Sequence, residues 1–175
     1  QVVQANLRLF ITVDGNVDRN SFLIHKKFPE ATIIEGDGRC YWARGMAMAE
    51  AVAMGHLPDY YLWLNEDVKL WPDAVEKLLH LARHNVNAIV VGPTVDPTSG
   101  VLTYGLRRRI GANPQRFRLL SLHETGDAAH TFNGNVALIS KSTHSIVGKI
   151  DGDFAHAYAD DDYGLRAVSM GFDLV

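Results

Sequence analysis

The sequence has few of the features that mark disulfide-rich, membrane-spanning or nucleic-acid-binding proteins. Cys40 is the only cysteine in 175 residues, which excludes an internal disulfide and an all-cysteine metal cage. The longest apolar runs, such as residues 88–91, fall far short of the roughly 20 residues that cross a bilayer. The net charge of −3 gives the chain as a whole no electrostatic reason to bind nucleic acid or an anionic membrane.

The first residues lack the basic head and the apolar stretch of a signal peptide. Together with the single cysteine, this predicts a cytoplasmic protein, with any membrane association peripheral at the inner face of the membrane. Hydrophobic residues make up 47% of the chain and charged residues 21%, as in ordinary globular proteins. There is no repeat, low-complexity tract or Gly/Ser linker, so we expect one domain over residues 1–175.

Apolar runs and amphipathic stretches alternate in the first half of the chain. We expect strands at residues 7–13, 31–34, 60–64 and 88–91, and helices at residues 18–28, 42–54 and 72–85. This alternation is typical of an α/β fold in which parallel strands are covered by helices on both faces.

The second half is more irregular. Residues 101–106 and 117–122 are expected to be extended segments around an arginine-rich loop that contains Arg107, Arg108 and Arg109. A strand at 136–140, a short helix to about residue 147, a helix at 161–170 and a strand from 172 complete the prediction. The whole pattern predicts an α/β protein with a mixed, mostly parallel sheet.

Acidic and amide side chains follow the strand at 60–64. Ligands of open α/β sheets bind outside the carboxyl ends of the strands, where Asn65, Glu66 and Asp67 would emerge. Mg²⁺ or Mn²⁺ takes one or two protein carboxylates and completes its shell with waters and substrate phosphates. The alternative is that Glu66 and Asp67 only solvate a loop before the next helix.

Asp160, Asp161 and Asp162 form a second acidic group, at the start of the last helix. Carboxylates there gain from the positive end of the helix dipole, so capping explains at least one of them. The functional interpretation is that one carboxylate is a general base pointing into a cleft. Asp14 closes the first strand, where it could bind a nucleotide base or ribose, or simply stabilise a turn.

Several motifs, taken in order, resemble the family-two glycosyltransferases, and most closely the rhamnosyltransferase-like branch. The motifs are Asp14-Gly15-Asn16, residues 41–46 (YWARGM), residues 61–67 (YLWLNED), Asn133-Gly134-Asn135, and residues 160–167 (DDDYGLRA) followed by Met170-Gly171-Phe172. The resemblance implies a GT-A fold and inverting transfer of a sugar from a nucleoside-diphosphate donor to a glycan or lipid-linked acceptor. Only six residues precede Leu7, so the family's first strand is expected to be missing.

The resemblance also implies roles for the acidic residues. Asp67 matches the metal-holding aspartate of the family's Asp-x-Asp motif, whereas its first position is Asn65, which adds no charge. Asp160 matches the presumed base, and Ala159 replaces the glutamate that normally precedes it. Asp162 is the rival base and also a candidate ion-pair partner of Arg166 at i,i+4. Asp14 matches the aspartate near the nucleotide base.

Further candidates for substrate or nucleotide binding come from the same motifs and from one loop; they are Trp42, Arg44, Gly45, Glu66, Asn133, Asn135 and His156. Asn133 and Asn135 could bond sugar hydroxyls or belong to a tight turn. His156 could contact a phosphate or the acceptor, or be a plain loop histidine. His80 and His84 have zinc-compatible spacing but are expected to be solvated.

Two other functions remain open from the sequence. The chain could be an inactive glycosyltransferase-like domain that binds a nucleotide or a partner, because Ala159 breaks the family's acidic pair. It could also be a metal-dependent phosphohydrolase that uses the same carboxylates to activate water.

Overall fold

The computed structural model describes residues 5–15, 17–124, 129–154 and 157–175. The protein is a mixed α/β protein, as the sequence predicts. It divides into two compact units, one formed by residues 1–58 and 149–159, the other by residues 59–148 and 160–175. No helix in the described part of the chain has the length and apolarity needed to cross a membrane.

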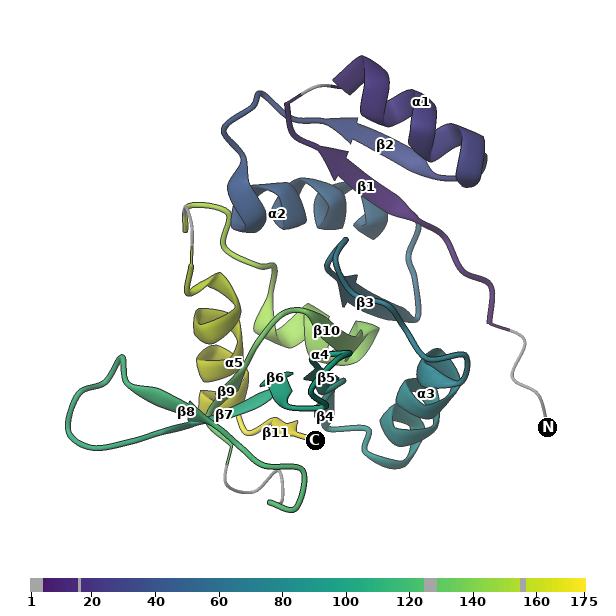
Figure 1. Ribbon diagram of the computed structural model, residues 1–175. Helices are drawn as coiled ribbons and strands as arrows, with labels where there is room; N and C mark the ends of the chain where they lie inside the picture. Colours follow the sequence, from purple (N-terminus) through teal and green to yellow (C-terminus); the bar gives the residue numbers. More distant parts are fainter. Residues whose placement is uncertain (1–4, 16, 125–128, 155–156) are drawn as a thin grey trace. The chain divides into compact units, whose positions relative to one another are not determined.

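The first unit is built on a pair of parallel strands (Figure 1). β1 (Phe10–Val13) and β2 (Thr32–Glu35) pair in register from Phe10↔Thr32 to Val13↔Glu35, and α1 (Val17–Lys27) connects them. α2 (Tyr41–Met54) packs against β1, where the Thr12 hydroxyl donates a hydrogen bond of 2.6 Å to the Gly45 carbonyl. The predicted parallel pairing is confirmed for these two strands.

A buried carboxylate holds the segment after residue 148 against α2. Glu50 is 5% exposed, and its Oε2 accepts a hydrogen bond of 3.0 Å from the Ile150 N–H. Gly152 then passes so close to the helix that an added Cβ would lie 3.1 Å from the Ala47 Cβ. A buried charge needs such partners to offset its lost hydration, so Glu50 is a structural residue of this unit.

The second unit contains a four-stranded sheet in the order β11-β4-β10-β3. Its strands are β3 (Tyr60–Leu64), β4 (Ala88–Val91), β10 (Val136–Ser140) and β11 (Asp173–Leu174). β4 pairs in parallel with β11, but β10 is antiparallel to both β3 and β4. The expectation of a mostly parallel sheet is therefore wrong here. The chain reaches β10 through short strands rather than a crossover helix. β10 therefore begins at the end of the sheet where β3 and β4 finish, and runs in the opposite direction.

The two central strands carry the core of this unit. All four residues of β4 are buried, as are the first four of β10, which is why both segments are apolar without alternation. α3 (Ala74–His84) packs Leu78, Leu79 and Ala82 against this core. It begins two residues later than predicted, because the Ala74 N–H bonds the Trp71 carbonyl in a preceding turn. α4 (Lys141–Val147) and α5 (Ala159–Ser169) complete the helices of the described chain.

Short antiparallel strands fill the region between β4 and β10. They are β5 (Thr94–Val95), β6 (Leu102–Tyr104), β7 (Leu106–Arg109), β8 (Phe117–Leu119) and β9 (Thr131–Phe132). β7 lies between β8 and β9 in a three-stranded sheet. Arg107, Arg108 and Arg109 thus lie within a strand, and their prediction as a loop is wrong. The hairpin loop is formed by residues 110–116 instead, which contain Gly111 and Pro114.

Candidate functional site

Two of the predicted motifs meet at one edge of the four-stranded sheet. β3 ends at Leu64, whose register partner is Val136, the first residue of the antiparallel strand β10. The residues after β3 and those before β10 therefore lie at the same edge. There the Asn65 N–H donates a hydrogen bond of 3.1 Å to the Asn135 carbonyl, while the Asn133 N–H bonds the Gly105 carbonyl at 3.0 Å.

The start of α5 joins the same edge through Asp160. Its Oδ2 accepts a hydrogen bond of 2.9 Å from the Gly134 N–H, and its Oδ1 accepts one of 2.9 Å from the Asp161 N–H. Asp160 thereby connects the helix to the loop of residues 133–135. The structure brings together three segments that the sequence indicates separately, namely the turn after β3, the loop before β10 and the first turn of α5.

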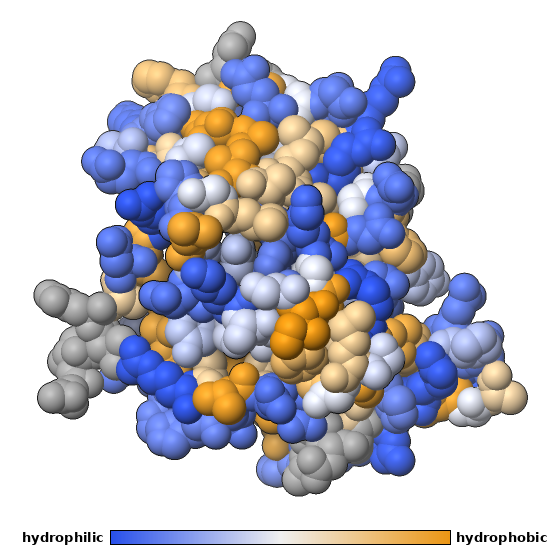
Figure 2. All heavy atoms as spheres, turned by 180° about the vertical axis from the view of Figure 1, so that it is seen from behind, coloured by the Kyte–Doolittle hydropathy of each residue, from blue (hydrophilic) through white to orange (hydrophobic). Residues whose placement is uncertain are grey.

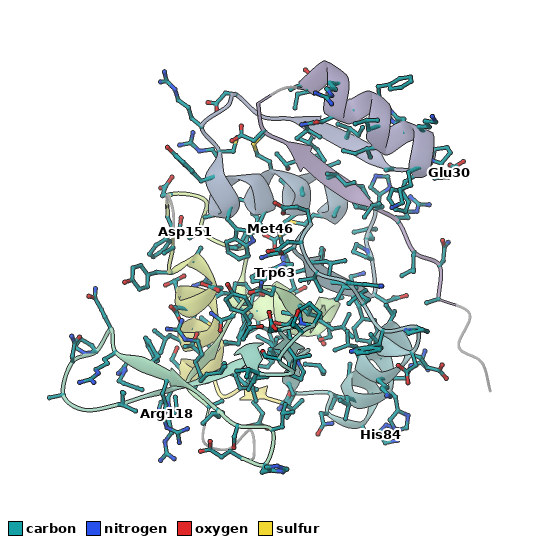
Figure 3. All side chains as sticks on the ribbon, viewed as in Figure 1. Glu30, Met46, Trp63, His84, Arg118 and Asp151 are labelled. Atoms are coloured by element: carbon teal, nitrogen blue, oxygen red, sulfur yellow. The ribbon has the colours of Figure 1, made fainter. Side chains whose placement is uncertain are left out.

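Aromatic rings pack around Trp63 of β3, which is labelled in Figure 3. Trp63 is 3% exposed, and its ring lies 4.8 Å from the Tyr163 ring at 65° and 6.2 Å from the Phe132 ring. Behind them, Gly164 of α5 crosses β9 so closely that an added Cβ would lie 2.9 Å from the Thr131 Cα. Trp63 therefore belongs to the core, and the close helix–strand contact fixes where Asp160 emerges.

Glu66 and Asp67 occupy the middle of a turn closed by a 3.2 Å hydrogen bond from the Val68 N–H to the Asn65 carbonyl. Both side chains are exposed. Among the residues that the structure describes, neither carboxylate has a hydrogen-bond or ion-pair partner. Mg²⁺ and Mn²⁺ sites in phosphate-binding proteins often use only one or two carboxylates, so Asp67 fits such an ion.

Asp161, the middle residue of the acidic group, is structural. It is 5% exposed, and both of its oxygens lie 2.7 Å from one guanidinium nitrogen of Arg107 in β7. Burial raises the pKa of Asp161 above its ordinary value, while the positive charge of Arg107 opposes this increase. No local pattern indicates this pair, because its members are 54 residues apart.

Asp162 forms the ion pair predicted from the i,i+4 spacing. Its Oδ2 lies 2.8 Å from the Arg166 Nε, and the same guanidinium donates a hydrogen bond of 2.6 Å to the Val147 carbonyl at the end of α4. Asp162 is thus already engaged in holding α5 to α4. Of the three carboxylates, Asp160 is the one directed at the loop of residues 133–135.

The remaining candidates belong to the first unit and form a group of their own. Asp14 follows β1, and its two oxygens accept hydrogen bonds from the Gly38 N–H at 2.6 Å and the Cys40 N–H at 2.9 Å. Desolvation by the neighbouring atoms raises the pKa of Asp14, but the backbone N–H groups of Cys40 and Gly38 outweigh this effect and lower it overall. Asp14 therefore anchors the loop before α2, in keeping with its interpretation as a turn residue.

Asp14, Asp37 and Cys40 bring three potential ligand atoms within 4.8 Å of one another. Burial raises the pKa of the Cys40 thiol, and the neighbouring carboxylates of Asp14 and Asp37 add to this increase. Metals bind the thiolate and lower the pKa of the thiol they coordinate, so this increase describes the group without an ion. The sequence did not indicate this group, since Asp37 lies 23 residues beyond Asp14.

α2 carries the other candidates of this unit. Trp42 is half-buried, and Arg44 is exposed with its guanidinium 3.8 Å from the Asp37 carboxylate. Gly45 meets β1 through its carbonyl, yet an added Cβ would be 3.8 Å from its nearest neighbour, so packing does not require glycine there. His156 lies outside the described residues.

A separate open hollow of about 620 Å³ occurs in the second unit, lined by Asp59, Tyr60, Ser140, Lys141, Ser142 and Ser145. Tyr60 begins β3 and Ser140 ends β10, so this hollow lies at the opposite edge of the sheet from Asp160. The Ser140 hydroxyl accepts the Thr143 N–H at 3.1 Å as the cap of α4. This serine is therefore accounted for by capping.

The sequence matches no model of a known protein family, and no curated protein shows significant similarity to it.

Proposed function

We propose that the chain is a metal-assisted, inverting glycosyltransferase of the GT-A type. It would move a sugar from a nucleoside-diphosphate donor to a glycan or lipid-linked acceptor, in the cytoplasm or at the inner face of the membrane. The observation that carries the proposal is the meeting of the turn after β3, the loop of residues 133–135 and Asp160 at one sheet edge. The carboxyl ends of β3 and β4 point to this edge, where α/β proteins bind ligands.

Asp67 is the residue that would hold Mn²⁺ or Mg²⁺. Its carboxylate is exposed at the turn, and Asn65 beside it offers no second charge, so most of the ion's ligands would be waters and donor phosphates. When bound, the ion would neutralise charge that develops on the diphosphate leaving group.

Asp160 is the proposed general base. Each of its oxygens accepts one backbone N–H, from Gly134 or Asp161, and a carboxylate oxygen has a second acceptor position. The two bonds orient the carboxylate and leave room for an acceptor hydroxyl, whose proton it would take as the glycosidic bond forms. Asp162 is the weaker candidate, because Arg166 already engages it at 2.8 Å.

The first unit carries residues whose chemistry suits a nucleotide. Asp14, Trp42, Arg44 and Gly45 lie around the end of β1 and the first turns of α2, and the guanidinium of Arg44 is exposed. Arg44 is the residue best suited to a phosphate, because guanidinium groups bond phosphate oxygens in pairs.

A binding function without turnover is the second candidate. The two backbone N–H bonds that Asp160 accepts are also consistent with a purely structural residue that connects α5 to the loop of residues 133–135. Ala159, buried at the start of α5, also leaves the site without a second carboxylate at that position. A metal-dependent phosphohydrolase would use Asp67 in the same way, with water in place of the acceptor.

Calorimetric titration with UDP, dTDP and GDP, each with Mn²⁺ and with chelator, tests the proposal first. We expect one nucleotide to bind only with metal, and Asp67→Asn to abolish that binding. Glu76→Gln, which removes an exposed carboxylate from α3, is the matched control and should bind normally. Failure of all three nucleotides to bind would contradict both the transferase and the nucleotide-binding function.

Transfer assays with the matching nucleotide sugar then separate the remaining candidates. Product that requires an added glycan or lipid-linked acceptor supports a transferase. Release of nucleoside monophosphate and sugar phosphate without acceptor supports a phosphohydrolase, and nucleotide binding without any turnover supports the binding domain.

A further inference from the structure

The hairpin formed by β7 and β8 has a charge that contrasts with the rest of the chain. Residues 106–120 contain five arginines and no acidic residue, although the net charge of the protein is −3. The hairpin projects from the three-stranded sheet in Figure 1, and its surface is largely hydrophilic in Figure 2. None of these arginines has a role in the proposed sugar transfer.

The strand register sorts the arginines onto two faces. Arg107 and Arg109 share a face with Phe117, and their guanidinium groups lie 5.1 and 5.7 Å from its ring centre. Arg107 also pairs with Asp161 of α5. This face is therefore directed toward α5, and part of its charge is neutralised.

The opposite face carries the other three arginines. Arg108 is the direct register partner of Arg118, and the 2.8 Å bond from the Ile110 N–H to the Arg116 carbonyl continues the register toward the loop. Arg116 is the last loop residue, directly before β8, and strand alternation continued by this one residue predicts its side chain on the same face as Arg108 and Arg118. We call Arg108, Arg116 and Arg118 the arginine face; Figure 3 shows Arg118 extending from β8.

Glu124 neutralises only one of these charges. Its two oxygens lie 2.9 and 2.5 Å from the two terminal nitrogens of Arg118, and this pairing lowers the pKa of Glu124 to about 2. Arg108 and Arg116 are exposed and form no ion pair within the described part of the chain. Like charges directly across a strand pair are destabilising, so an external anion would stabilise this face.

We propose that the arginine face docks on an anionic phospholipid surface. Guanidinium groups bond phosphate oxygens in pairs, and neighbouring arginines on an open, projecting hairpin can each reach a separate headgroup. Binding of a small soluble anion usually requires a concave pocket, and none of the three arginines lines the hollow described above. The negative charge elsewhere has little effect, because screening at about 0.1 M salt limits interactions to roughly 10 Å.

Co-sedimentation of the whole protein with vesicles tests the proposal. We expect binding to phosphatidylcholine vesicles that contain phosphatidylglycerol, no binding to phosphatidylcholine alone, and weakening with added salt. Each arginine near such a surface is worth about a fivefold change in affinity, so Arg108→Gln/Arg116→Gln should weaken binding about 25-fold. Arg39→Gln/Arg83→Gln removes two exposed arginines from α2's preceding loop and from α3, and should bind like the parent.

Glu124→Gln provides a gain of function. It releases Arg118 for headgroup contacts, so we expect binding to anionic vesicles about fivefold tighter, whereas Glu76→Gln, with the same change in net charge, should have no effect. Thermal unfolding of each variant confirms that it is folded.

Three results would overturn the proposal. They are equal binding to neutral and anionic vesicles, equal loss in the two double variants, and release of the bound protein by pyrophosphate at constant ionic strength. The last result would assign the arginine face to a soluble phosphate compound. None of these outcomes depends on nucleotide binding or sugar transfer, so the docking proposal stands or falls separately from the proposed function.

Discussion

Asp160, Asp161 and Asp162 are consecutive, and an α-helix turns by about 100° per residue, so each carboxylate faces a different neighbour. Asp160 accepts backbone N–H groups at the sheet edge, Asp161 is buried against Arg107, and Asp162 pairs with Arg166. Chemically identical groups thus acquire different environments. Of the three carboxylates, Asp160 is the one that contacts the loop of residues 133–135.

Asp160→Asn is the most direct test of the proposed base. The amide oxygen can still accept one backbone N–H, so the loop contact is partly kept while the basic carboxylate is lost. We expect sugar transfer to fall by about 10²–10⁴-fold, the usual contribution of a general base, with nucleotide affinity unchanged. Initial rates and calorimetry measure the two quantities. If Asp162→Asn abolishes transfer and Asp160→Asn does not, the base is Asp162.

The pair of Arg118 and Glu124 predicts an acid-dependent loss of stability. The pKa of Glu124 is about 2 in the folded protein and 4.5 for the unperturbed group, so folding favours its ionised form. Its contribution is present above pH 4.5 and is lost as the pH falls toward 2. Urea unfolding across this range should show a shallower acid decline for Glu124→Gln than for the parent. An identical decline would contradict the pairing.

At the scale of elements, the contact between α5 and β9 positions the site. Gly164 allows the helix to approach Thr131, and the Thr131 hydroxyl donates a hydrogen bond of 3.0 Å to the Asp161 carbonyl in the first turn of α5. This contact is made at Asp161, directly after Asp160, whose side chain accepts the Gly134 N–H. The geometry of the sheet edge therefore depends on a helix–strand distance that only glycine permits.

Gly164→Ala should separate the two elements. The added Cβ would lie 2.5 Å from the Thr131 Oγ1 and 2.9 Å from its Cα, and backbone cannot move away as easily as a flexible side chain. Overpacking of this kind costs about 1–3 kcal/mol of unfolding free energy, measurable by urea denaturation. Gly55→Ala is the control, since its Cβ would be 3.4 Å from the nearest atom and its φ of −62° suits alanine. Equal stability of the two variants would argue against the close contact.

At the scale of the molecule, the chain crosses between the two compact units at residues 58/59, 148/149 and 159/160. None of these crossings has the glycine- and serine-rich composition of a flexible linker. The last crossing lies inside α5, whose first residue, Ala159, belongs to one unit and whose remaining residues belong to the other.

We therefore expect one cooperative unfolding transition, in keeping with the single domain that the sequence predicts. Scanning calorimetry should give a calorimetric enthalpy equal to the van't Hoff enthalpy. Two resolved transitions, or a ratio of these enthalpies well above one, would show that the units unfold independently.

The sequence by itself determined the elements whose signal is local. β3, β4 and β10 occupy the residues predicted for them, because continuous apolar and β-branched runs bounded by turn residues leave few alternatives. The same reasoning placed Asn65, Glu66 and Asp67 at a strand end and paired Asp162 with Arg166 at i,i+4. The α/β class follows from these local patterns as well.

Only the tertiary structure decided which segments meet. Nothing near β10 in the sequence indicates that it runs antiparallel to β3, and strands of two residues such as β9 are too short to show periodicity. The strand environment of Arg107 and its pairing with Asp161 likewise depend on residues more than 50 positions apart. Such pairings form when segments that are distant in the sequence bury surface together. The local pattern of one segment therefore does not predict which segment it pairs with.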